Sequence, residues 1–112
     1  MSLERPRRSL ALLGLLLLSM GGTSLQAAAP AGAEFVIKDF MFEPLTLKIK
    51  AGERVRWTNK DDEPHTVVSD AGVFRSSALD SEETFSFQFD KPGTYHFACS
   101  IHPRMVGTIV VE

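Results

Sequence analysis

The chain has 112 residues, a formal net charge of −2 and a single cysteine. This length accommodates one small domain or little more, and one cysteine excludes an internal disulfide. No run of basic residues is found after residue 8. Binding to nucleic acid is therefore not expected.

The first 33 residues have the features of a secretory signal peptide. An arginine-rich segment, residues 5–8, precedes an apolar stretch at residues 10–20, and small residues continue to Ala33. The apolar stretch is well short of the roughly 20 residues that span a bilayer, so stable membrane insertion after cleavage is not expected. We predict cleavage after Ala33, with Ala27 and Ala31 as alternatives, and export to the periplasm. The arginine pair leaves both general secretory and twin-arginine export open.

Removal of this leader, residues 1–33, leaves residues 34–112 as one domain. The leader carries three arginines and one glutamate, so its loss takes the net charge from −2 to −4. A domain this small is near the lower limit for a core that is stable without disulfides or a metal. A bound metal would supply stability and a use for the unpaired thiol. We interpret the acidic run Asp61-Asp62-Glu63 as a solvated loop, with an interaction patch as the alternative.

Apolar residues alternate with polar ones along most of residues 34–112, most clearly at Phe85, Phe87 and Phe89. This period of two is typical of strands that place one face on a core. Together with the turn residues between the runs, it predicts an all-β fold, an antiparallel Greek-key β-sandwich of about seven strands. We expect Trp57 and the phenylalanine stripe to fill the space between the sheets. The predicted strands are residues 34–39, 45–50, 53–59, 65–69, 82–90, 93–99 and 106–112.

A candidate metal site comes from residues spaced three apart near the C-terminus. Cys99, His102 and Met105 lie at the end of a predicted strand and in the turn that follows it, where such positions converge. His65 lies at the start of an earlier predicted strand. One thiolate, two imidazoles and one thioether are the ligands of blue-copper electron-transfer sites, and they suit both Cu(I) and Cu(II). We therefore predict one copper ion per chain, bound by these four residues.

Each of these residues also has an ordinary structural explanation. A lone cysteine is commonly a small buried hydrophobic residue, and a methionine commonly fills a core. His102 would then be an exposed loop residue and His65 a residue at a strand end. The spacing, the export signal, the missing disulfide and the β pattern together favour the metal site. His96 alternates away from Cys99, and we predict that it is not a ligand.

The ligand pattern resembles that of cupredoxins, the blue type 1 copper proteins. The short loop at residues 99–105 is similar to that of amicyanins, whereas plastocyanins place the methionine further on. The resemblance extends to the framework segments 47–59, 64–67 and 92–97. It implies three strong copper ligands and one weak axial ligand, which are His65, Cys99 and His102, and Met105, respectively.

Three residues depart from the family pattern. Thr66 stands where cupredoxins commonly have an asparagine that braces the ligand loop, so either its hydroxyl substitutes or the site is looser. Ile101 replaces a common proline, which removes some preorganisation of the loop. Arg104 replaces an apolar residue near the exposed edge of His102, where the family usually presents a hydrophobic docking patch.

These observations predict a monomeric periplasmic electron carrier that is not an enzyme. Electrons would pass through the edge of His102, where redox proteins would dock transiently. In amicyanin-like sites the loop histidine can protonate and leave Cu(I), so the reduction potential would rise as the pH falls if His102 behaves in this way. One alternative is a copper-storage or copper-delivery protein with the same ligands in an open site. Another is a metal-free binding module, which would tolerate Cys99→Ser.

Overall fold

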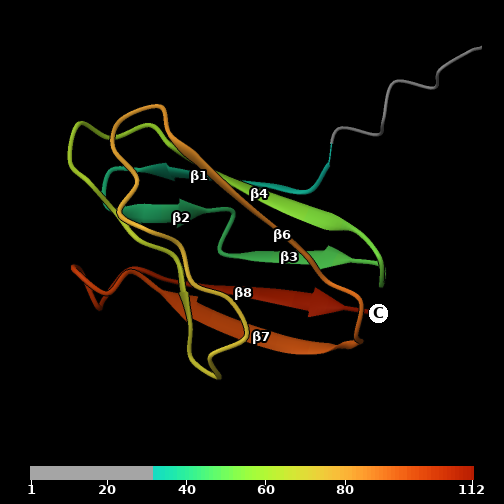
Figure 1. Cartoon of the computed structure of the whole chain (residues 1–112). Coiled ribbons are helices and arrows are strands. Elements are labelled where there is room, and N and C mark those ends of the chain that lie inside the picture. Colours follow the sequence, from blue (N-terminus) through green and yellow to red (C-terminus); the bar gives the residue numbers. More distant parts are fainter. Residues whose placement is uncertain (1–31) are drawn as a thin grey trace, which may run out of the picture.

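A computed structural model of the protein describes residues 32–112, whose regular elements are all strands (Figure 1). The predicted signal peptide therefore lies, except for Gly32 and Ala33, outside the described residues. Within residues 32–112 there is no helix long and apolar enough to cross a membrane. The eight described strands are β1 (Glu34–Lys38), β2 (Met41–Glu43), β3 (Thr46–Ile49), β4 (Arg54–Asn59), β5 (Val68–Ser69), β6 (Thr84–Gln88), β7 (Gly93–Ala98) and β8 (Val106–Val111).

The strands form two four-stranded sheets that face each other as a sandwich (Figure 1). One sheet has the order β2-β1-β4-β6 and the other the order β3-β8-β7-β5. The predicted β-sandwich is thus confirmed. Each sheet also contains one parallel pair, β1 with β4 and β3 with β8, so the pairing is not antiparallel throughout. Alternation of apolar residues indicates which face is buried and contains no information on strand direction.

Two predicted strands differ from the structure. The segment predicted at 34–39 ends in a two-residue turn, Asp39-Phe40, and the chain returns as β2, with Lys38 opposite Met41. The segment predicted at 65–69 forms a strand only at its end, as β5. Its first residue, His65, instead makes an isolated bridge with Leu79, through N–H to carbonyl bonds of 3.0 and 2.7 Å. The alternation of apolar and polar residues shows which side chains face the core, but it does not show with which segment the backbone pairs.

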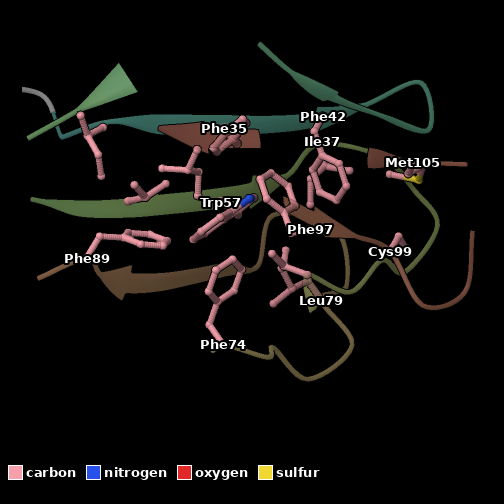
Figure 2. Packing of buried hydrophobic residues seen from close by; sticks show 14 of the residues in the cluster. Phe35, Ile37, Phe42, Trp57, Phe74, Leu79, Phe89, Phe97, Cys99 and Met105 are labelled. Carbon is pink, nitrogen blue, oxygen red and sulfur yellow. The ribbon is translucent and has the colours of Figure 1, made fainter. Parts of the chain in front are cut away.

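Aromatic side chains fill the space between the sheets (Figure 2). Trp57 is fully buried and meets the ring of Phe97 edge-on, with centroids 5.4 Å apart. From the predicted stripe, Phe89 is buried, whereas Phe85 and Phe87 are half-buried and pack against the same core. Edge-on aromatic pairs are favoured beyond the area that they bury. The predicted core position of Trp57 is therefore confirmed.

Phe97 reaches its place in the core by lying across Gly107. The two residues are partners in the pairing of β7 with β8. A Cβ atom added to Gly107 would lie only 2.3 Å from Cζ of Phe97. The phenylalanine therefore requires glycine opposite it. Because Phe97 is two residues before Cys99 in the chain, this packing also helps to determine where the thiol lies.

We expect Gly107→Ala to destabilise the metal-free protein by roughly 1–3 kcal/mol, since overpacking a tight core forces the neighbouring side chain to move. Denaturant unfolding followed by far-UV circular dichroism measures the change. Thr94→Ala, at an exposed position of β7, is the control and should change stability by less than about 0.5 kcal/mol. Equal stability of the two variants would contradict the close approach of Phe97.

Candidate metal centre

The predicted ligands come from two loops. His65 lies between β4 and β5, in the segment that bridges to Leu79. The other three belong to the loop between β7 and β8, and Figure 2 shows Cys99 and Met105 together at one end of the core. The pairing of β5 with β7, with Val68 opposite Ala98, brings the two loops side by side. Residues far apart in sequence thus meet at one end of the sandwich.

Three of the predicted ligands form a compact triangle. Sγ of Cys99 lies 3.9 Å from Nδ1 of His65 and 3.9 Å from Nδ1 of His102. The three ligand atoms are all within 4.8 Å of one another. Ligand bonds of about 2.0–2.3 Å spread around one ion separate the donor atoms by about 3.5–4 Å. The triangle therefore fits a single metal ion bound by two imidazoles and one thiolate.

The fourth predicted ligand, Met105, is buried beside this loop. Its backbone closes the loop, because its N–H donates to the carbonyl of His102 at 2.9 Å and its carbonyl accepts from Cys99 N–H at 3.1 Å. Its role as an axial ligand stays a prediction. His96 lies apart from the site, exposed on β7, with Nδ1 3.1 Å from the hydroxyl of Thr108. The cluster of potential metal ligands within residues 32–112 does not include it.

The carboxylate of Asp61 orients the ring of His65. Its Oδ2 lies 2.8 Å from Nε2 of His65, so the ring donates the Nε2 proton and leaves Nδ1 free to bind a metal. Burial raises the pKa of Asp61, but N–H bonds from Phe40 and Asp39 and the contact with His65 together lower it below its usual value. Asp61 therefore stays ionised near neutral pH.

The role of Asp61 is not apparent from the sequence. The interpretation of the acidic run as a solvated loop holds for Asp62 and Glu63, which are exposed. It fails for Asp61, whose side chain is only 11% exposed. The sequence shows only that Asp61 lies four residues before His65. In a loop, such a spacing does not determine whether the two side chains meet.

Thr66 joins the two ligand loops. Its hydroxyl accepts the N–H of Ser100 at 2.8 Å and lies 2.7 Å from the Ser100 hydroxyl. Its backbone N–H points to Sγ of Cys99 at 3.4 Å, and its hydroxyl lies 3.7 Å from the same sulfur. The structure supports the expectation that the Thr66 hydroxyl substitutes for the asparagine common in cupredoxins, since this hydroxyl braces the ligand loop.

The remaining departures lie on the outer side of the loop. Ile101 is 50% exposed, and Arg104 is also exposed. His102 is partly exposed, unlike the buried His65 and Cys99. One ligand ring of the triangle therefore reaches the protein surface, next to an apolar side chain and a cationic one.

Comparison with known proteins agrees with this geometry. The model of the cupredoxin-like domain family matches residues 9–111. The chain belongs to the cupredoxin-like family. It is 40% identical over 101 residues to amicyanin-alpha of Methylorubrum extorquens, with 85% of each chain covered. It is 34% identical over 111 residues to the chloroplastic plastocyanin of Tetradesmus obliquus, covering 87% of this chain and 72% of the relative.

A solved structure of an amicyanin variant in its Cu(I) form has the same fold. It superimposes on this cupredoxin with a TM-score of 0.69 at 31% sequence identity, covering 72% of this chain and 82% of the amicyanin. The resemblance inferred from the ligand loop and the framework segments is therefore confirmed. Within residues 32–112, the side chains of His65, Cys99 and His102 form a triangle that suits a metal.

The environment of Cys99 favours the thiolate. Burial raises the pKa of the thiol, but the N–H groups of Thr66 and Ile101 and the Thr66 hydroxyl contribute to lowering the pKa from 9.0 to about 6. The thiolate is the form that binds a metal. The metal-free cupredoxin thus already holds this ligand in its binding form at neutral pH.

This lowered pKa predicts how stability depends on pH. The thiol has a pKa of about 6 when folded and about 9 when unfolded, so its contribution is absent below pH 6 and complete above pH 9. We expect the free energy of unfolding of the metal-free protein to rise across this window by up to about 4 kcal/mol relative to Cys99→Ser. Denaturant unfolding at several pH values measures it. Parallel pH profiles of the two proteins would contradict the prediction.

The brace between the loops gives a second prediction. Thr66→Val keeps the shape of the side chain but leaves the N–H of Ser100 without its acceptor. We expect a loss of roughly 1–3 kcal/mol in the free energy of unfolding, measured on the metal-free protein by denaturant. Thr66→Ser retains the hydroxyl, and its loss should be smaller. If the serine variant is destabilised as much as the valine variant, the hydroxyl is not the brace.

Proposed function

We propose that this cupredoxin binds one copper ion per chain and carries single electrons between redox proteins. The observation that supports this most directly is the triangle of one sulfur and two ring nitrogens within 4.8 Å. These donor types are acceptable to both Cu(I) and Cu(II). His65, Cys99 and His102 would be the strong ligands, and the buried Met105 the weak axial ligand. The copper would supply the one-electron chemistry.

The chain's own contribution is to hold the donors in place. Asp61 orients His65, Thr66 braces the loop that carries Cys99, and backbone bonds close that loop at Met105. Donors that are fixed in this way keep nearly the same positions in both oxidation states. Such a site suits electron transfer, because little has to rearrange when the charge changes.

Electron exchange would take place at His102, the one partly exposed ring of the triangle. Phe40 and Ile101, 45% and 50% exposed, are available as apolar contacts near it. Partners that must separate quickly use small transient interfaces of this kind. Arg104 adds a positive charge to the same loop, so the preferred partner surface would combine apolar and acidic groups.

The remaining parts of the proposal concern where and how the carrier works. The leader predicted at residues 1–33 would direct it to the periplasm. It would act as a monomer and would not be an enzyme, because an electron carrier transforms no substrate. The homology to amicyanin and plastocyanin supports the role as an electron carrier.

Copper titration tests the proposal. We expect Cu(II) added to the purified metal-free protein at equal concentration to produce the intense blue thiolate-to-copper charge-transfer band, followed by absorption spectroscopy. Cys99→Ser should abolish the band. His96→Ala, which removes an exposed histidine outside the triangle, should leave it unchanged. A colourless or pale complex of the unmodified protein would overturn the type 1 assignment.

The same preparation separates a carrier from a storage or delivery protein. The burial of Cys99 and His65 favours slow exchange, so copper should be lost slowly to a competing chelator and the protein should show a reversible one-electron couple by voltammetry. Rapid loss to the chelator without a reversible couple would instead indicate copper handling.

A further inference from the structure

The turn between β1 and β2 has an unusual backbone. Asp39 and Phe40 have φ angles of 52° and 56°, in the left-handed region. The type I′ hairpin turn requires this conformation at both residues and normally uses asparagine or aspartate followed by glycine. A bulky residue such as phenylalanine rarely adopts it. The turn therefore needs support from outside its own residues.

Asp61 provides that support. The N–H of Asp39 donates to Oδ1 of Asp61 at 2.7 Å, and the N–H of Phe40 donates to Oδ2 at 3.0 Å. Oδ2 also accepts from Nε2 of His65. Asp61 is itself fixed, because its N–H donates to the side chain of Asn59 at 2.9 Å. One carboxylate thus connects the strained turn with a ring of the metal triangle.

The turn places the Phe40 ring against both histidines of the triangle. Its centroid lies 5.2 Å from that of His65 and 4.9 Å from that of His102, and the planes are nearly perpendicular, at 89° and 87°. Perpendicular arrangements are favoured for aromatic rings. Within residues 32–112, the His102 side chain has no hydrogen-bond contact except the one between Nδ1 and Cys99. The His102 ring also meets the ring of His65, with centroids 5.1 Å apart, so ring contacts restrain it, and Phe40 supplies a contact from outside the triangle.

We propose that Phe40 is a positioning residue of the metal centre, held over the two histidine rings by Asp61. Its ring lies against both histidine rings and limits the orientations of His102. Its own strained backbone persists because the carboxylate that orients His65 also satisfies the turn. This inference rests on the proposed copper centre, although the arrangement of the rings is already present in the metal-free chain.

The first test replaces the ring and keeps an apolar side chain. We expect Phe40→Leu to retain the blue band but to lose copper to a chelator about 10-fold faster, since changes to groups that support metal ligands cost roughly 10- to 100-fold in affinity. Met41→Leu is the matched control at the next position, which is also exposed, and should stay within about twofold of the unmodified protein. Phe40→Tyr keeps the ring and should behave like the unmodified protein.

A second measurement does not depend on copper. In the NMR spectrum of the metal-free protein, the ring protons of His102 should shift in Phe40→Leu, because the ring current of Phe40 is lost, and should stay in place in Met41→Leu. If Cu(II) gives no blue complex even in the unmodified protein, the proposed function fails while this result still decides the arrangement of the rings. Unchanged spectra and unchanged copper loss in Phe40→Leu would overturn the inference.

The link to Asp61 is tested by a double-mutant cycle. Asp61→Asn weakens the support of the turn, so adding Phe40→Leu to it should accelerate copper loss by less than about twofold further. Residues that act as one unit give such non-additive effects. If Phe40→Leu retains its full effect in the Asp61→Asn background, Phe40 acts independently and Asp61 does not hold it.

Discussion

The bonds between Thr66 and the Cys99–Ser100 pair join segments that are 33 and 34 residues apart in the chain. Through them the loop after β4 and the loop after β7 become one structure, with the thiol of Cys99 inside it. The sandwich brings the loops together by pairing β5 with β7. The metal triangle and the lowered pKa of the thiol depend on this connection.

Asp61 plays a comparable part on the other side of the site. A single carboxylate accepts from His65 and from both N–H groups of the turn that carries Phe40. An ionised carboxylate makes stronger hydrogen bonds than a neutral acceptor, which is what a strained turn and a metal ligand both require. The site is thus supported by two polar contacts of different kinds, while the aromatic core below it supplies the packing.

Much of the fold was accessible from residue pattern because burial imposes a period of two on a strand. The alternation around Phe87 and Trp57 predicted strands that the structure contains. The pattern did not reveal β2, because the turn before it contains Asp39-Phe40 and no glycine, proline or asparagine. It also overextended the strand at His65, where the backbone pairs with Leu79 in place of a sheet neighbour.

The sequence by itself indicated the chemistry, since the predicted ligands, one thiolate, two imidazoles and a thioether, suit copper in both oxidation states. It also distinguished His96 from the ligands through alternation alone. Only the tertiary structure decided that Asp61 and Phe40 belong to the site and that the hydroxyl of Thr66 is a brace. Ligand type is a property of single side chains and can be recognised in a sequence. The supporting contacts join loops that become neighbours only when the two sheets pack, so local sequence does not contain them.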